Sequence, residues 1–266
     1  MPLRLAVIGW GAITQRFVAL LRQRNAGKVE IVAVGLRSTS CCDDLPKDLP
    51  VLTDPAGLAA MRPDLVVEAA GREAVGQWGE AALAASPAFA VASTSAFCDD
   101  ALLARLLAVA EAHGSQLLIP AGALAGVDGL AAASTLGLTD VLHAIVKPPA
   151  AWRGTAAEEL VDLATLSGRT TFFTGTAREA ARRFPQNANV AAITALAGLG
   201  LDATRVELVA DPAATRNGHR IRAEGAFGTM DLAIENRPLA ANPKSSEMTA
   251  LNLVRLVENR YRPLVC

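Results

Sequence analysis

The side chains best suited to proton transfer in this sequence are its three histidines, His113, His143 and His219. An imidazole exchanges protons near pH 7 more readily than any other side chain. His113 falls at the end of a predicted helix, where a cation is stabilised, and His143 lies in an apolar strand typical of a core or an interface. His219 opens a predicted strand. It is either a general acid/base or a strand-edge histidine bonded to a loop carbonyl.

A glycine-rich turn near the N-terminus could bind a dinucleotide. The run from Gly9 to Thr14, G-W-G-A-I-T, stands between a predicted strand and a predicted helix. The first glycine permits a tight turn, the second lets a pyrophosphate approach the backbone, and the helix N-terminus supplies donors. Thr14 replaces the usual third glycine without blocking the site. The alternative is a plain tight turn. The residues expected to contact a dinucleotide are Gly9, Gly11, Ala12 and Ile13.

The segment after the second predicted strand bears on the choice between NAD and NADP. An NAD site usually carries an acid there, on the ribose hydroxyls, and none occurs between Ile31 and Cys42. Arg37 could face a 2′-phosphate, with Ser38 as a neutral donor. The segment slightly favours NADP over NAD, unless Arg37 is only a solvated loop residue.

Small residues follow several later strands and could admit the nicotinamide ribose. Ala70 and Gly71 end one strand, at the carboxyl edge where an open α/β sheet binds its ligand. The loop at 120–128 follows the last strand of the first half and is also built from small residues. The backbone amide of Ala123 in this loop could bond a nicotinamide carboxamide.

Short apolar runs alternate with amphipathic stretches in the first 120 residues. Strands are predicted at 5–8, 30–34, 65–69, 88–92 and 116–119, with helices at 13–24, 75–85 and 99–113. Continuous apolar strands alternating with helices are typical of a parallel sheet covered on both faces. The pattern predicts an α/β fold whose residues 1–120 form a doubly wound Rossmann domain that binds a dinucleotide.

The second half has a different pattern. Strands are predicted at 142–147, 169–174, 205–210, 219–224 and 227–234, the last two pairing across Gly225, with helices at 156–163 and 190–198. Residues 121–244 are therefore predicted to form an α/β substrate and dimerisation domain with an open mixed sheet. Residues 245–266 are predicted to carry a C-terminal helix that returns to the Rossmann domain.

Composition excludes several classes of protein. The chain has 266 residues, a formal net charge of −1 and 4% aromatic residues, which argues against a nucleic-acid binder. Its four cysteines form neither a zinc pattern nor a disulfide framework, and no metal site is expected. Apolar runs are too short to span a membrane. We therefore expect a soluble, cytoplasmic protein.

Several short sequence motifs in the second half, taken in their order along the chain, resemble those of the L-aspartate dehydrogenase family. The most specific are N-A-N-V-A-A at 187–192, A-D-P at 210–212 before Asn217-x-His219, and N-P-K at 242–244. The resemblance covers essentially the whole chain. It implies oxidation of L-aspartate to iminosuccinate with NAD or NADP, followed by hydrolysis to oxaloacetate and ammonia or by use in NAD synthesis. It also implies a homodimer built through the second domain.

The same resemblance assigns roles to individual residues. His219 aligns with the catalytic histidine of the family, and Ala123 and Asn189 align with positions that contact the cofactor. Thr14 and Gly218 depart from the residues usual in the family, which bears on cofactor affinity and substrate range more than on the reaction class.

A substrate with two carboxylates needs cations or amides around it. Lys147 and Lys244 stand beside prolines, and each could clamp a carboxylate or serve as a structural ion-pair partner. Asn187 could contact the substrate or simply cap the helix that follows it. Two other functions stay open: a related imine or semialdehyde reductase of the dihydrodipicolinate-reductase type, and an NAD(P)-binding sensor without turnover.

Overall fold

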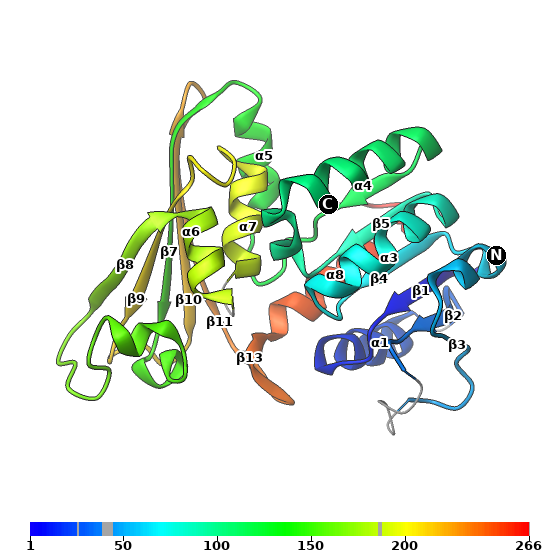
Figure 1. The fold of residues 1–266 in the computed structure, drawn as a ribbon, viewed down its shortest axis with the longest axis horizontal. Coiled ribbons are helices and arrows are strands. Elements are labelled where there is room, and N and C mark those ends of the chain that lie inside the picture. Colours follow the sequence, from blue (N-terminus) through cyan, green and yellow to red (C-terminus); the bar gives the residue numbers. More distant parts are fainter. Residues whose placement is uncertain (26, 39–44, 186–187, 266) are drawn as a thin grey trace. The chain divides into compact units, whose positions relative to one another are not determined.

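The computed structural model describes residues 1–25, 27–38, 45–185 and 188–265, without the side chains of residues 243 and 244. The chain divides into two compact units. The first contains Met1–Pro120 and the tail from Thr249, and the second contains Ala121–Met248. Each unit is built on its own sheet (Figure 1).

The first unit has a six-stranded sheet in the order β3-β2-β1-β4-β5-β6, in which every neighbouring pair is parallel. The chain runs from β1 toward one edge and then returns to the other side of β1, which is the order of a Rossmann fold. The predicted α/β class with a doubly wound parallel sheet is thus confirmed. The strands are β1 (Leu3–Ile8), β2 (Val29–Gly35), β3 (Val51–Leu52), β4 (Leu65–Glu68), β5 (Ala88–Val91) and β6 (Gln116–Leu118).

Helices connect these strands. They are α1 (Ala12–Arg24), α2 (Leu58–Met61), α3 (Arg72–Ala85) and α4 (Asp100–His113), with short 3-10 turns η2 (Pro55–Gly57) and η3 (Thr94–Cys98). The start of α4 follows from its sequence, because the Asp99 carboxylate accepts hydrogen bonds from the backbone of Ala101 and Leu102. The two-residue strand β3 and the single turn α2 were not predicted, since neither is long enough to show a period.

The C-terminal helix α8 (Glu247–Glu258) contributes to the core of the first unit. Its buried Leu253 and Val257 join a cluster that includes Leu5 of β1 and Phe17 of α1. At its end, the buried Glu258 carboxylate accepts a hydrogen bond from Asn25 at 3.0 Å. The amphipathic face of α8 therefore covers one face of the first sheet.

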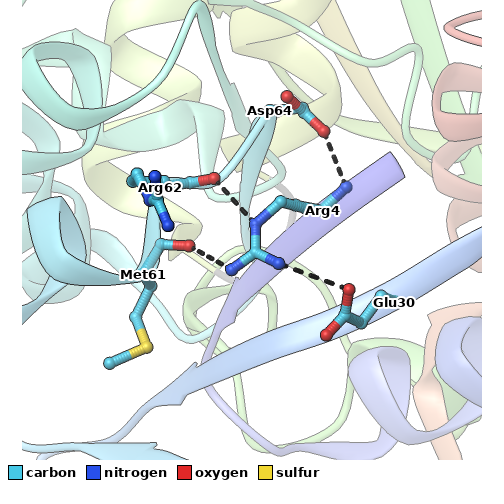
Figure 2. A network of polar contacts seen from close by, with 5 residues as sticks. All are labelled: Arg4, Glu30, Met61, Arg62 and Asp64. Atoms are coloured by element: carbon cyan, nitrogen blue, oxygen red, sulfur yellow. Dashed lines mark hydrogen bonds and ion pairs between the residues drawn. The ribbon is translucent and has the colours of Figure 1, made fainter. Parts of the chain in front are cut away.

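Arg4 stabilises the amino-terminal edge of the same sheet (Figure 2). Its backbone N–H donates to Asp64, and its guanidinium donates to the carbonyls of Met61 and Arg62 and to Glu30. These bonds satisfy carbonyls at the end of α2, where Arg62 has a φ of 44°. The network ties β1 to its neighbours at the edge opposite the predicted dinucleotide site.

The second unit has a five-stranded sheet in the order β11-β10-β7-β9-β8. β7 and β9 are parallel and the other pairs are antiparallel, so the prediction of an open mixed sheet is confirmed. The predicted pairing of the last two strands across Gly225 is also present. The strands are β7 (Leu138–Lys147), β8 (Thr170–Thr176), β9 (Arg205–Ala210), β10 (Asn217–Gly225) and β11 (Gly228–Asn236). A small separate hairpin pairs β12 (Pro238–Leu239) with β13 (Asn242–Ser246).

Three helices of the second unit lie on one side of this sheet (Figure 1). They are α5 (Val127–Ser134), α6 (Ala177–Arg183) and α7 (Ala188–Ala197). Along β10 the burial alternates, with His219 and Ile221 buried and Arg220 and Arg222 exposed. Side chains at alternate positions of a strand point to opposite faces. The buried residues therefore form the inner face of the sheet, against the helices.

The helix predicted at 156–163 was wrong. The 3-10 turn η4 (Pro149–Trp152) precedes this segment, and only one further 3-10 turn, η5 (Ala156–Glu159), forms there. The Asp162 carboxylate accepts bonds from the Ala164 backbone and the Thr165 hydroxyl, and such local bonds compete with helical ones. The helix α6 was missed, although Thr176 and Glu179 form a capping box at its start.

Candidate functional site

The carboxyl edge of the first sheet brings two predicted segments together where the strand order reverses. Gly9 follows β1 with a φ of +92°, and a Cβ on it would lie 2.6 Å from the Cβ of Ala70, after the neighbouring strand β4. A side chain at this position would therefore clash with the second loop. The glycine is required both by its backbone conformation and by this close approach.

Gly11 leaves the N-terminus of α1 open. It occupies the N-cap position without a capping side chain, and a Cβ on it would have no atom within 4 Å. The first N–H groups of a helix, here those of Ala12 and Ile13, have no acceptor within the helix. Open space beside free donors at a positive helix end fits the pyrophosphate of a dinucleotide.

A buried carboxylate supports the loops around this edge. Glu68, at the end of β4, is fully buried and accepts hydrogen bonds from the backbone of Ala70, Gly71 and Ser93 and from the Ser93 hydroxyl, at 2.6–3.0 Å. Burial raises the pKa of this carboxyl, and the four bonds oppose that rise. Glu68 thereby holds the turn that carries Ala70 and Gly71 against the end of β5. Sequence analysis missed this role, although an acid ending an apolar strand was a visible signal.

The residues predicted to read the ribose lie just beyond β2. The Arg37 side chain is exposed, Ser38 is half-buried, and the backbone of Leu36 donates to the carbonyl of Leu52. The rest of the predicted segment, from residue 39 onward to residue 44, lies outside the described residues. An exposed guanidinium here is compatible with a 2′-phosphate.

The loop carrying Ala123 is held within the second unit. The Ala123 carbonyl accepts a hydrogen bond from the amide of Asn236, at 2.7 Å, and the Asn236 side chain is almost fully buried. The preceding Gly122 has a φ of +60°, and a Cβ on it would lie 2.8 Å from the side chain of Ile193. The conformation of this loop is therefore set by its surroundings. Asn236 had not been singled out in the sequence.

Two histidines and a threonine form a buried chain of hydrogen bonds on the inner face of the second sheet. Nδ1 of His219 lies 3.2 Å from Nε2 of His143, and Nδ1 of His143 lies 2.9 Å from the hydroxyl of Thr194 in α7. His143 and Thr194 are fully buried and His219 is 6% exposed. The register pairs His219 with Ile145 and Ile221 with His143, so the two rings are diagonal neighbours on adjacent strands.

Burial governs the charge of this cluster. It lowers the pKa of His143 to about 3. Burial, followed by the charges of His143 and Lys147, holds the pKa of His219 well below its usual value. Both rings are therefore neutral near pH 7, and His219 has the protonation state of a base.

Lys147 is the predicted cation that the fold brings near His219. It lies two residues beyond Ile145, the strand partner of His219, and its ammonium sits 5.2 Å from the ring centre of Trp152. Trp152 is fully buried and donates to the carbonyl of Val209. Burial lowers the pKa of Lys147 to about 8, so the side chain remains largely charged at pH 7.

The remaining predicted residues are less informative. Asn189 is exposed in the first turn of α7, the helix that carries Thr194. Lys244 lies in β13, and only its backbone is described. Asn187 lies outside the described residues. Of the predicted substrate residues, Lys147 is thus the one whose side chain the structure places beside His219.

A cavity of about 340 Å³ also touches β10. Its lining includes Arg169, Arg216, Arg220 and His219. Arg220 neighbours His219 along the strand and is exposed, so its side chain points to the outer face of the sheet, opposite His143. The part of the cavity lined by Arg220 therefore lies on the face opposite His143, while His219, a member of the buried cluster, also contributes to the lining.

Among the described residues there is neither a cluster of metal-ligating side chains nor a helix that could span a membrane. No group of three or more His, Cys, Asp or Glu side chains there could hold a metal ion. Within the same part of the chain, no helix is both long enough and apolar enough to cross a membrane.

Comparisons with known proteins agree over almost the entire chain. Residues 128–260 match the family model "Aspartate dehydrogenase, C-terminal", and residues 9–120 match "Homoserine dehydrogenase, NAD binding domain". An L-aspartate dehydrogenase of Brucella anthropi is 58% identical over 98% of this chain and 97% of its own. The crystal structure of aspartate dehydrogenase from Thermotoga maritima covers all of both chains, with 27% identity and a TM-score of 0.77. Dihydrodipicolinate reductase from Paenisporosarcina covers 97% of this chain and 94% of its own, with 16% identity and a TM-score of 0.55, which shows a shared fold only.

Proposed function

Since the chain belongs to the L-aspartate dehydrogenase family, we propose that it oxidises L-aspartate to iminosuccinate, with NAD or NADP as the hydride acceptor. The family and its NAD-binding domain make it an NAD(P)-dependent oxidoreductase. The observation that carries the proposal is the buried, neutral His219, whose Nδ1 is bonded to a second histidine. Such a ring can act on a substrate through its other nitrogen.

His219 is proposed to move protons at the α-nitrogen of the substrate. The α-ammonium group must lose a proton before its lone pair can form a C=N bond. Nε2 of His219 accepts this proton and becomes an imidazolium. A bound nicotinamide would supply the acceptor for the hydride of the α-carbon. The imidazolium then releases this proton to solvent. The neutral ring can take a proton from the water that attacks the imine and return it to the nitrogen that leaves as ammonia, which gives oxaloacetate.

The first unit is proposed to hold the cofactor. The open N-terminus of α1 suits the pyrophosphate, and the absence of an acid between Ile31 and Cys42 slightly favours NADP. Arg37 would pair with the 2′-phosphate. The residues proposed to contact the dinucleotide are Gly9, Gly11, Ala12, Ile13, Arg37, Ser38, Ala70, Gly71, Ala123 and Asn189.

The substrate carboxylates are proposed to meet positive and polar side chains. Lys147 is the best-supported contact for a substrate carboxylate, because its ammonium is close enough to lower the pKa of His219 and remains charged near pH 7. Lys244 and Asn187 are further proposed contacts. An ammonium and a neutral base side by side would orient a substrate that carries both a carboxylate and an amine.

The proposal extends to the assembly and the compartment. We propose a homodimer built through the second unit, for which the outer face of its sheet is available. We also propose that the reaction takes place in the cytoplasm, where cysteines stay reduced.

The decisive experiment is nicotinamide reduction by the purified protein at mildly alkaline pH. L-aspartate, D-aspartate, L-glutamate and a cyclic imine would each be offered, with NAD(P) or with the reduced cofactor as the direction requires. We expect turnover with L-aspartate alone, and faster turnover with NADP than with NAD. Reduction of the cyclic imine with an inert L-aspartate would instead establish an imine reductase. Cofactor binding without any turnover would establish a sensor.

A further inference from the structure

The hydrogen bonds behind His219 form a chain with a definite direction. We propose that His143 and Thr194 are positioning residues that hold His219 with its proton on Nδ1, so that Nε2 is left as the proton acceptor. This inference rests on the proposed function for its meaning in catalysis, but the protonation pattern itself can be measured without turnover.

The direction starts at the helix. The Thr194 hydroxyl donates to the carbonyl of Val190, one turn earlier in α7, at 3.1 Å. A hydroxyl has one proton, so its oxygen must act as the acceptor in the 2.9 Å contact with His143. Nδ1 of His143 then carries the proton of that ring.

The remaining assignments follow from the first. A neutral His143 protonated on Nδ1 has only a lone pair on Nε2, so in the 3.2 Å contact it must accept from Nδ1–H of His219. His219 is neutral as well, and its Nε2 is therefore unprotonated. The α-ammonium proton of the substrate passes to this nitrogen, while the proton on Nδ1 stays bonded to His143 and none travels through the chain.

Reversing the direction of the hydrogen bond between Thr194 and His143 would remove the proton acceptor from His219. If Thr194 donated to His143 instead, His143 would donate to Nδ1 of His219, and Nε2 of His219 would carry a proton. The ring would then be unable to accept a proton from an ammonium. Burial strengthens the choice, because His143 and Thr194 are fully enclosed and no bulk water can replace a lost partner.

Removing the Thr194 hydroxyl tests the chain at its origin. Thr194→Val keeps the shape but leaves Nδ1–H of His143 without an acceptor, which favours the reversed tautomers. We expect kcat to fall about tenfold to a hundredfold, the range of one buried hydrogen bond, with the KM for the cofactor unchanged. Thr194→Ser restores a hydroxyl and should regain most of the lost turnover.

A matched control lies in the same unit. Thr204 is also fully buried, and among the described residues its hydroxyl has no hydrogen-bond partner. Thr204→Val therefore makes the same chemical change outside the chain and should leave kcat unchanged. An equal fall of kcat in both valine variants would overturn the positioning role.

The second readout is the tautomer itself. Long-range ¹H–¹⁵N spectra of the intact protein, labelled at histidine nitrogen, distinguish a protonated from an unprotonated ring nitrogen. We expect Nε2 of His219 to be unprotonated in the wild type and protonated in Thr194→Val. A protonated Nε2 in the wild type would overturn the inference even if Thr194→Val failed to fold. Absence of aspartate oxidation with the expected tautomer would overturn the proposed function alone.

Discussion

The two units each bury an ionisable cluster against a sheet, but they satisfy it in opposite ways. In the first unit, the Glu68 carboxylate accepts four hydrogen bonds, three of them from backbone N–H groups of the loops after β4 and β5. In the second, His143 and His219 bond to each other and to Thr194, so their partners are side chains.

This difference distinguishes a buried group that fixes the backbone, Glu68, from one that we propose exchanges protons, His219. Glu68 is fully satisfied and buried, so its effect is to fix the turn at Ala70 and Gly71, which faces Gly9. The histidine chain ends on His219, whose second nitrogen we propose as the proton acceptor for the substrate. A carboxylate surrounded by hydrogen-bond donors stabilises the structure, whereas an imidazole that is hydrogen-bonded at one nitrogen can exchange a proton at the other.

The largest effect is expected when the imidazole of His219 is removed. His219→Ala should lower kcat by about 10²–10⁴-fold, the usual contribution of a general acid/base, and should leave the cofactor affinity nearly intact. Steady-state kinetics with L-aspartate and fluorescence titration of the reduced cofactor measure both quantities. His113→Ala, at the exposed end of α4, is the control and should have wild-type kinetics. Unchanged turnover in His219→Ala would contradict the assignment.

The next largest effect concerns Lys147, the cation near His219. Lys147→Gln should raise the KM for L-aspartate about tenfold to a hundredfold, because a hydrogen bond to a charged group is lost. In the wild type, the KM should rise above pH 8, since burial lowers the Lys147 pKa to about 8 and its charge disappears there.

Two controls sharpen this test of Lys147. The pH-dependent rise in KM should be absent in Lys147→Gln, and the exposed Lys28→Gln should behave as the wild type. A rise that persisted in Lys147→Gln would assign it to another group.

A smaller effect, on stability and binding, is expected in the first unit. Glu68→Ala leaves buried donors without an acceptor and should lower the free energy of unfolding by about 1–3 kcal/mol. It should also weaken cofactor binding, because the turn at Ala70 loses its anchor. Denaturant unfolding and cofactor titration measure the two effects. Glu73→Ala, exposed in the first turn of α3, is the matched control. Full stability of Glu68→Ala would remove the contrast between the two units.

The smallest effect concerns the choice of nucleotide. Arg37→Ser should weaken NADP binding by about tenfold and leave NAD binding unchanged, because only NADP carries the 2′-phosphate. Titration with each reduced cofactor measures the ratio. Arg22→Ser, in the exposed part of α1, should change neither. Equal losses for both nucleotides would show that Arg37 does not read the phosphate.

The fold was predictable where patterns are local. Continuous apolar strands, the glycine turn and the acids at residues 99–100 each act on their immediate neighbours, and the structure has the corresponding elements. Prediction failed at 156–163, where the side chain of Asp162 bonds the local backbone instead of a helix forming. A composition pattern records helix-compatible residues but not the outcome of that competition.

The candidate site was predictable only in part, because most of its contacts join residues that are far apart in the sequence. His219 could be singled out by residue type and by family resemblance, and Gly9 by its motif. His143 was interpreted as a core or interface residue from its apolar strand, and it is fully buried, but its contact with His219, 76 positions away, left no local signal. The roles of Asn236 and Thr194 left no local signal, since they depend on bonds to a loop and a strand distant in the sequence, whereas Glu68 could have been noticed as an acid ending an apolar strand.

The sequence by itself determined the class of the fold, the place of the dinucleotide turn and the family, because these follow from local periodicity, glycine chemistry and recurrent words. Tertiary structure alone decided which groups meet. The register of β7 and β10 sets His143 diagonally beside His219, and the packing of α7 brings the Thr194 hydroxyl to the far side of His143. A protonation state depends on such contacts and on burial, which exist only once strands and helices have come together.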